Sequence, residues 1–485
     1  MNKPIRRVAI ACLLLFAALL VNANVVQFAD AKNLRDKPDN TRTLYAQYDR
    51  QRGDIVTAAG GAIASSTPTT DTLKYLRTYE NGPLYAPVTG FYSIVYGATD
   101  IESAENAILA GTDDRLFVRQ LTNLITGRTP QGGSVILTID PAVQEAAYSA
   151  LAGRKGAVVA VDPSTGAILA LVTSPSYDPN VLSSHNQASI QQNWKKLVAD
   201  PNNPMLDRAL SQTYPPGSTF KLVTAAAALS SGGYTPQSTI PAPNTLPYPN
   251  STKSLQNFAG ESCGNGKTTT LIDALTISCN TAFGGLGETL GQDALRKQAE
   301  AFGFNSTFSI PMKSANSVFP SNLDDAQTIQ SAIGQFDVRA TPLQMAMIAA
   351  TIANGGTLMK PYLVKQLVGP DLAVIETTKP TAIRQALSAE VAAELTTMME
   401  SVVDKGTGTP ARIAGVKVAG KTGTAENAPG KPPHAWFVSF APAASPRIAV
   451  AVVVENGGGA NDATGAKVAA PIAKAVMTAA LKETQ

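Results

Sequence analysis

The chain has 485 residues, of which 44% are apolar and only 15% are charged, and its formal net charge is +3. This length and composition predict two or three domains with large cores and exclude wholesale disorder. Basic and acidic residues are mixed without a long basic run, which argues against nucleic acid as a partner.

The first 30 residues predict export from the cytoplasm. Two arginines precede an apolar run over residues 8–21, which resumes after two asparagines. Positive charge before an apolar run keeps the N-terminus inside and sends the following chain across the membrane. We therefore expect a cytoplasmic tail at residues 1–7, a single transmembrane signal-anchor at residues 8–28, and a large extracytoplasmic part formed by the rest of the chain.

Cleavage of this segment is the alternative. The uninterrupted apolar run suits a signal peptide, and Val21-Asn22-Ala23 resembles a small-residue cleavage site. Cys12 is not expected to carry a lipid, because most of the apolar run follows it. In either case the body of the protein is exported.

The next segment, residues 30–133, has a different character from the rest of the chain. It carries several Tyr and Arg residues and short strand-like runs such as residues 90–96, with few long helical patterns. A turn-rich stretch at residues 128–133 ends it. We predict a smaller N-terminal pedestal or dimerisation-like domain here, followed by one large domain over residues 134–485.

The large domain begins with alternating element types. A strand over residues 135–138 precedes a helix over residues 141–151, for which Asp140 is the expected N-cap. Two apolar runs, residues 157–161 and 168–172, flank a turn sequence and predict a hairpin.

A mostly helical middle follows, and strand signals return near the end of the chain. The late elements are strands at residues 415–419, 435–440 and 448–454, and a helix at residues 469–482. Hairpins on both sides of a helical middle predict an antiparallel sheet flanked by helices, which is an α+β fold.

The chain has only two histidines, His185 and His434. A zinc hydrolase usually needs two or three histidine ligands, and the sequence has no His-Glu-x-x-His pattern. No Gly-x-Ser-x-Gly elbow accompanies either histidine, which argues against a Ser-His-Asp hydrolase. The sequence therefore indicates neither a metal site nor a cofactor, and each histidine alone is more often a packed or surface side chain.

A Ser-x-x-Lys motif joins Ser218 to Lys221 between a Pro-Pro-Gly turn and an alanine-rich run. The run is a strong helix former, so the motif is expected in the first turn of a buried helix. Residues three apart on a helix share a face, which brings the lysine amine toward the hydroxyl. A lysine can remove the proton of a serine nucleophile if burial lowers the pKa of its amine. On its own, a motif this short occurs by chance about as often as it marks a catalytic site.

Two further motifs follow in the chain. Ser278 and Asn280 form a Ser-x-Asn pattern after an apolar segment, although the same pattern recurs at residues 184–186 and 314–316. Lys421, Thr422, Gly423 and Thr424 form a Lys-Thr-Gly-Thr run on a predicted strand. Gly423 would remove bulk where a substrate could pair along that strand.

Together, the order Ser-x-x-Lys, Ser-x-Asn, Lys-Thr-Gly resembles the signature of penicillin-binding proteins and class A β-lactamases. Thr138-Ile139-Asp140 and Ile333-Gly334-Gln335 are further family-like stretches. Near the N-terminus, residues 52–55 are similar to the Arg-Gly-x-Ile start of class B members, but Thr57-Ala58-Ala59 stand where an Asp-Arg pair is usual. The whole string is most similar to the short actinobacterial penicillin-binding protein A type.

This resemblance implies a penicillin-binding transpeptidase fold and a serine acyl-enzyme mechanism. Ser218 would attack the penultimate D-Ala of a stem peptide, Lys221 would take its proton, and Ser278 and Lys421 would assist. Asn280 would hold the substrate amide, and Thr422 and Thr424 would hold the terminal carboxylate. The catalytic set is thus Ser218, Lys221, Ser278, Asn280 and Lys421, and the substrate-binding set is Thr422, Gly423 and Thr424.

The implied activity is peptidoglycan D,D-transpeptidation, inhibited by β-lactams, in cell wall synthesis and cell division. The implied partners are stem peptides ending in D-Ala-D-Ala, the cytoplasmic membrane, a separate glycan polymerase and the division machinery. Three alternatives share the motifs. They are a D,D-carboxypeptidase, a β-lactamase, which should carry a Glu-x-x-Leu-Asn stretch that this sequence lacks, and a β-lactam-binding sensor. The N-terminal segment is too short for a glycosyltransferase domain.

Cys263 and Cys279 are the two cysteines in the exported part, 16 residues apart around a Gly-Asn-Gly turn. The compartment is oxidising, so a disulfide beside Ser278 and Asn280 is expected. The alternative is that Cys279 is a small buried side chain and Cys263 a loop thiol.

Overall fold

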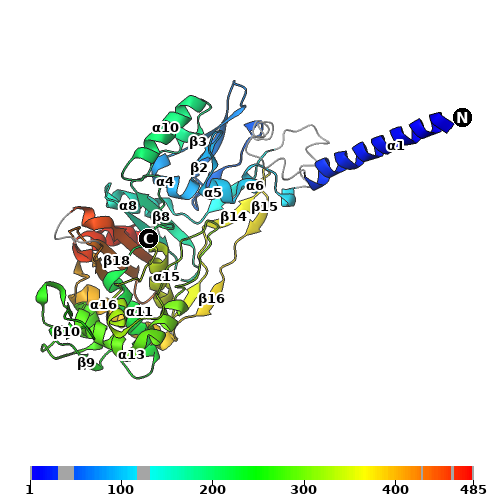
Figure 1. The fold of residues 1–485 in the computed structure, drawn as a ribbon. Coiled ribbons are helices and arrows are strands. Elements are labelled where there is room, and N and C mark those ends of the chain that lie inside the picture. Colours follow the sequence, from blue (N-terminus) through cyan, green and yellow to red (C-terminus); the bar gives the residue numbers. More distant parts are fainter. Residues whose placement is uncertain (1–2, 31–47, 117–130, 428–429, 460–463, 483–485) are drawn as a thin grey trace.

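A computed structural model describes residues 3–30, 48–116, 131–427, 430–459 and 464–482. Helix α1 (Lys3–Asn24) continues into a π-helical turn (Val25–Ala29). This apolar helix extends away from the body with no buried residue, and it is long enough to cross a membrane (Figure 1). Residues 1–2 of the predicted tail and residues 128–130 of the predicted boundary turn lie outside the described residues.

The part of the molecule next to α1 is built on a six-stranded sheet with the order β15-β14-β6-β1-β2-β3. Its strands come from both sides of the predicted domain boundary, and β6 pairs with β1 in parallel. The sheet therefore ties the N-terminal segment to the large domain. The strands are β1 (Ile55–Val56), β2 (Ala62–Pro68), β3 (Tyr75–Tyr79), β6 (Ser134–Leu137), β14 (Val364–Val368) and β15 (Val374–Thr377).

A buried ion cluster fixes the start of this sheet. Glu102 is fully buried, and its two carboxylate oxygens lie 2.5 and 2.6 Å from Nε of Arg52 and Arg77. Paired charges of this kind are costly to break, because the remaining charge would stay buried. The predicted strand at residues 90–96 is mostly wrong, since only Tyr92–Ser93 forms a strand (β4). The neighbouring elements are α4 (Gly82–Thr89), β5 (Gly97–Ala98), α5 (Asp100–Ala104), α6 (Asn106–Leu109), α9 (Asn180–Ser183) and α10 (Gln187–Ala199).

The large domain is built on an antiparallel five-stranded sheet with the order β17-β18-β19-β7-β8. Side chains alternate between the two faces, and both faces are covered, which is why the central strands β19 and β7 are continuous apolar runs. Val450 and Val452 pack on one side of β19, while Ala451 and Val453 pack on the other. The strands are β7 (Gly156–Val161), β8 (Ile168–Ser174), β17 (Ala419–Ala425), β18 (His434–Ala441) and β19 (Ile448–Val454).

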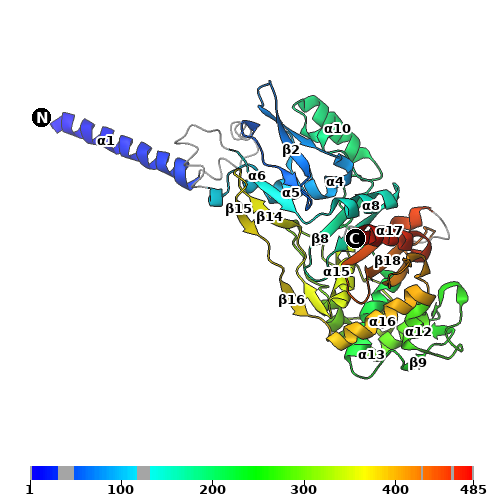
Figure 2. The same cartoon turned by 180° about the vertical axis from the view of Figure 1, so that it is seen from behind.

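Helices cover both faces of this sheet (Figure 2). Helices α8 (Pro141–Leu151) and α17 (Ala470–Lys482) form one layer, and α15 (Pro342–Ala353) lies in the other. The helical middle of the chain extends from the α15 side. It contains α11 (Lys221–Ser230), α12 (Leu271–Thr276), α13 (Asn280–Ala301), α14 (Asp325–Ser331) and α16 (Ala389–Lys405), with the short strands β9 (Thr239–Pro241), β10 (Thr245–Pro247), β11 (Ser254–Gln256), β12 (Thr268–Thr270), β13 (Thr357–Met359) and β16 (Ala382–Gln385).

The expected α+β fold is confirmed, with helices packed on an antiparallel sheet. The helix at residues 141–151 has the predicted bounds, and the Asp140 carboxylate accepts hydrogen bonds from the backbone N–H groups of Ala142 and Val143. The strand predicted at residues 415–419 is wrong, because Gly415 has a φ of +73° in a tight turn bridging Ile413 and Val416. The strand that carries Lys421 begins only at Ala419.

Candidate active site

A cavity of about 1650 Å³ opens beside the edge strand β17. Residues from all three sequence motifs line it, although they are far apart in the chain. The motif residues in its wall are Ser218, Ser278, Asn280, Thr422 and Thr424.

Ser218 lies in a 3-10 turn (Gly217–Phe220) that leads directly into α11. Gly217 has a φ of +53°, and a Cβ at this position would lie 2.9 Å from the backbone oxygen of Thr424. Only glycine lets the turn approach β17 this closely. The nucleophile candidate therefore sits at a helix N-terminus, where free backbone N–H groups favour a developing negative charge.

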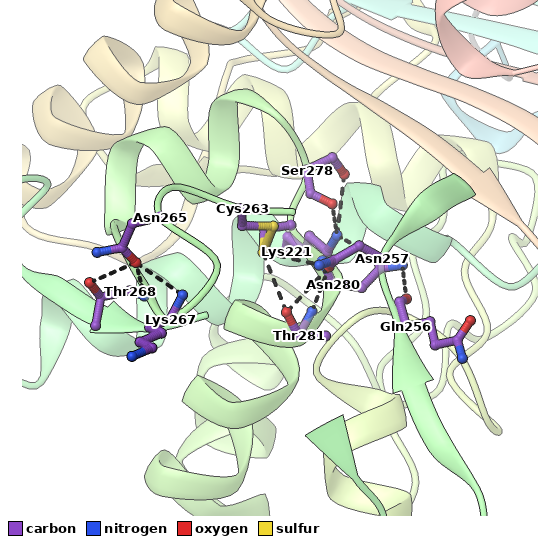
Figure 3. The surroundings of a disulfide bond; sticks show 11 residues. Lys221, Gln256, Asn257, Cys263, Asn265, Lys267, Thr268, Ser278, Asn280 and Thr281 are labelled. Atoms are coloured by element: carbon purple, nitrogen blue, oxygen red, sulfur yellow. Dashed lines mark hydrogen bonds between the residues drawn. A yellow bond between two sulfur atoms is a disulfide. The ribbon is translucent and has the colours of Figure 1, made fainter. Parts of the chain in front are cut away.

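Lys221 is fully buried and faces the Ser-x-Asn motif (Figure 3). Its Nζ donates hydrogen bonds to the backbone oxygen of Ser278 at 2.7 Å and to Oδ1 of Asn280 at 2.7 Å. Burial and the neighbouring Lys421 hold the pKa of Lys221 well below its ordinary value. Within the described part of the chain, no hydrogen bond joins this amine to Ser218, although the two residues share a helical face.

Ser278 links the two lysines of the site. Its Oγ lies 3.2 Å from Nζ of Lys221 and 2.8 Å from Nζ of Lys421. Lys421 is fully buried, and burial lowers its pKa to about 7. Ser278 has a φ of +64°, a strained conformation for a serine that turns the chain between α12 and α13. A hydroxyl between two amines that both give up protons readily can relay a proton.

Asn257 is a site residue that sequence reasoning missed. Its Oδ1 accepts hydrogen bonds from the backbone N–H groups of Asn280 and Thr281, at 2.9 and 3.0 Å (Figure 3). It therefore caps the start of α13 from a distant loop. The Asn280 side chain is held as well, because its Nδ2 donates to the backbone oxygen of Gln256. A lone asparagine 23 residues from the helix it caps carries no sequence signal.

The structure contains a disulfide between Cys263 and Cys279, whose Cα atoms are 6.1 Å apart. Cys279 lies between Ser278 and Asn280, so the bond ties the start of α13 to the preceding loop (Figure 3). This tether and the Asn257 cap act on the same helix end.

The Lys-Thr-Gly-Thr run lies on β17. Thr422 Oγ1 is 2.6 Å from Thr407 Oγ1, a contact that sequence reasoning also missed. A Cβ on Gly423 would lie 2.8 Å from Cγ2 of Thr219 and 2.9 Å from Cβ of Trp436. Position 423 therefore requires glycine because β17 packs closely against the turn that carries Ser218 and against β18, and not only because a substrate could pair there.

The two histidines of the chain lie in different places. His185 contacts Asp71 at 2.6 Å and is not in the cavity wall. His434 lines the cavity, and its Nδ1 accepts the backbone N–H of Asn456. Burial lowers the pKa of His434. Among the described residues, no group of three or more His, Cys, Asp or Glu side chains is arranged to hold a metal ion.

Residues 156–478 match the family model of the penicillin-binding protein transpeptidase domain, and residues 52–135 match that of the penicillin-binding protein A dimerisation domain. The chain is 50% identical to the "Peptidoglycan D,D-transpeptidase PbpA" of Mycolicibacterium smegmatis over 100% of both chains. It is 48% identical to the protein of the same name from Mycobacterium tuberculosis H37Rv over 99% of both chains.

Solved structures of penicillin-binding protein A from M. tuberculosis have the same fold. The ceftriaxone acyl-enzyme complex is 49% identical, with a TM-score of 0.88, and the match covers 90% of this chain and 100% of that one. The penicillin G acyl-enzyme complex is 49% identical, with a TM-score of 0.85, and the match covers 89% and 100%.

Proposed function

The chain belongs to the penicillin-binding protein transpeptidase family, and from this we infer that it is a peptidoglycan D,D-transpeptidase that β-lactams acylate. Its role is in cell wall synthesis. The observation that carries this function is the cavity whose wall holds both Ser218, at the start of a helix, and Ser278, whose hydroxyl contacts two buried lysines. The relatives with solved acyl-enzyme complexes cover nine-tenths of the chain.

We propose that Ser218 is the nucleophile. Its Oγ attacks the carbonyl carbon of the penultimate D-Ala, and its proton passes toward the Lys221 amine. A lysine whose pKa is lowered can accept that proton near neutral pH, where an ordinary lysine cannot. The backbone N–H groups of Ser218 and Thr424 face the oxyanion in this scheme.

In the second half of acylation, the bond to the terminal D-Ala breaks. The leaving amine takes a proton through Ser278, whose hydroxyl contacts both lysines. Thr422 and Thr424 hold the terminal carboxylate, and Asn280 binds the substrate amide while orienting Lys221. A side-chain amine of a second stem then attacks the ester, forming the cross-link and freeing Ser218.

The sequence-derived domain organisation supports a division of labour. We propose that residues 30–133 form a pedestal, residues 134–485 form the catalytic domain, and residues 8–28 anchor the protein in the cytoplasmic membrane. The apolar helix at Lys3–Ala29 supports the anchor. A glycan polymerase and division proteins are the proposed partners of the pedestal, because a chain with one catalytic domain needs polymerised glycan from elsewhere.

The test is to incubate the full-length protein in detergent with labelled benzylpenicillin and to map the modified residue. We expect the label on Ser218 and none in the S218A variant, while S231A, at the exposed end of α11, is labelled normally. Label on another serine would overturn the proposed nucleophile. Supplying a stem peptide with a free amine then separates transfer to the amine from transfer to water, and release by water alone would instead indicate a D,D-carboxypeptidase.

A further inference from the structure

The wall of the active-site cavity includes Glu455, which the catalytic scheme does not use. Glu455 follows β19 directly and lines the same cavity as Ser218. Its side chain is 18% exposed, whereas that of its partner Arg208 is 2% exposed. Both residues line the cavity, and the carboxylate is the more exposed member of the pair.

The carboxylate is held in place by one of its two oxygens. Oε1 accepts hydrogen bonds from Nε of Arg208 at 2.9 Å and from the hydroxyl of Tyr214 at 2.8 Å. Burial and Glu455 raise the pKa of Tyr214, which keeps its hydroxyl a donor. Among the described residues, Oε2 has no hydrogen-bond partner, so it is open to a ligand.

Arg208 acts as a support and not as a second ligand group. Its other guanidinium nitrogens donate to the backbone oxygens of Asn202 and Asn203, so its donors point into the protein. Three further cationic side chains line the cavity, namely Lys155, Arg339 and Lys431. Arg339 donates to the backbone oxygens of Phe336 and Val338, and Lys155 donates to the backbone oxygen of Pro201. A positively charged group that reaches Glu455 from the cavity can therefore bind its Oε2, which has no hydrogen-bond partner among the described residues.

The position of Glu455 decides which part of a substrate it can reach. Val454 pairs with Ala435, which pairs with Thr424, so Glu455 lies two strands away from β17, about 10 Å across the sheet. The Tyr214 that holds it is four residues before Ser218. A carboxylate at this distance is too far to touch the reacting carbonyl and can contact only a remote part of the bound peptide.

A diamino acid side chain spans that distance. The residue before the acylated D-Ala has its Cα about 3.8 Å further along the peptide, and a side chain of four carbons and an amine adds about 6 Å. The donor stem carries such an amine, because donor and acceptor are copies of one peptide and the acceptor reacts through its amine.

We propose that Glu455 binds the side-chain ammonium group of the donor stem, one residue before the acylated D-Ala, and thereby makes the enzyme prefer donors with a free amine. This inference rests on the proposed transpeptidase function. It makes Glu455 a specificity-determining residue, with Arg208 and Tyr214 as positioning residues that hold one carboxylate oxygen and leave the other free.

The test uses two penicillins that differ only at the end of the acyl side chain, which occupies the place of the preceding stem residue. One carries a 6-aminohexanoyl group and the other its N-acetylated form. In the wild-type protein we expect the amine compound to acylate Ser218 about tenfold faster, as a charge-assisted hydrogen bond would give. In E455Q the ratio should fall to about one. The ratio within one variant cancels any loss that affects both compounds equally.

The matched control is Glu426→Gln, another carboxylate in the cavity wall but exposed to water, which should keep the preference. A wild-type ratio near one, an unchanged ratio in E455Q, or loss of the preference in E426Q would each overturn the proposal. If E455Q does not fold, Glu455→Asp keeps the charge and should retain a preference above one. A wild-type protein that benzylpenicillin does not acylate would refute the proposed function itself, whereas equal acylation by both compounds refutes only the role of Glu455.

Discussion

At the scale of single residues, the site depends on two buried lysines that contact one hydroxyl. Each amine is desolvated, and Lys421 adds a positive charge near Lys221, so both lysines lose a proton more readily than a free lysine does. In water, an amine with the ordinary lysine pKa would be almost wholly protonated at neutral pH. The fold therefore supplies a base where the free side chain would not.

This lowering predicts the pH dependence of acylation. A general base acts when deprotonated, so the rate should fall as the pH drops through the lowered pKa values, one of which is about 7. Above that range the rate should level off and stay level toward pH 10. The measurement is the rate constant for acylation by benzylpenicillin between pH 5 and 10. A rate that keeps rising tenfold per pH unit up to pH 10 would mean that the base has an ordinary lysine pKa.

The motif residues could be predicted from the sequence, but the residues that position them could not. Ser218, Lys221 and Ser278 belong to short patterns in a fixed order, and the pattern itself carries the chemistry. Asn257 and Glu455 act through contacts made across 23 and 247 residues of chain, to Asn280 and Arg208 respectively. Only folding brings such pairs together, so no local spacing indicates them.

At the scale of elements, the start of α13 is fixed by a side-chain cap from another segment. Replacing Asn257 by Ala removes the acceptor for two backbone N–H groups and should lower the free energy of unfolding by about 0.5–2 kcal/mol. The same change frees Asn280 and should slow acylation. The matched variant Asn257→Asp keeps the acceptor oxygen. It should therefore retain most of the free energy of unfolding and most of the acylation rate. Equal behaviour of the two variants in thermal unfolding and penicillin acylation would rule out the cap.

The disulfide acts on the same element. Closing a loop of about 15 residues stabilises a fold by about 3 kcal/mol, chiefly by restricting the unfolded chain. We expect the full-length protein, denatured without reductant, to show one titratable thiol, that of the free Cys12. Three titratable thiols would refute the bond. Reduction of the bond should lower the midpoint of thermal unfolding, and the unreduced C12S variant should show no titratable thiol.

Sequence patterns predicted elements well where both faces of a strand are covered, and less well where the chain turns. The strands β7 and β19 are continuous apolar runs, so their positions follow from composition alone. The strand over residues 415–419 was misplaced, because an apolar alternation there runs through a glycine turn. The pairing of β14 with β6 joins segments more than 200 residues apart, which no local pattern indicates.

At the scale of the whole molecule, the elements follow one another from the apolar N-terminal helix to the candidate active site. The apolar helix α1 lies at one end, the six-stranded sheet follows, and the five-stranded sheet with its helical extension lies beyond it (Figures 1 and 2). The six-stranded sheet contains β6, β14 and β15 from the large domain, so the N-terminal segment and the large domain share backbone hydrogen bonds. The N-terminal segment therefore cannot detach from the large domain without breaking strand pairing.

The N-terminal helix is the part of the chain that would hold the molecule at the membrane. The apolar helix continues past Asn22 and Asn24 to Ala29, which gives 27 residues that include an 18-residue stretch with a mean hydropathy of 2.4. At about 1.5 Å per residue this is roughly 40 Å, enough to span a bilayer core of about 30 Å. A signal peptide needs only the shorter run before Asn22. We therefore expect the helix to remain attached, so that intact mass spectrometry of protein extracted from membranes shows a chain beginning at its N-terminal methionine or at the following residue. A mature chain that begins at Asn24 and is recovered from the soluble fraction would show that the helix is removed and that the enzyme acts unanchored.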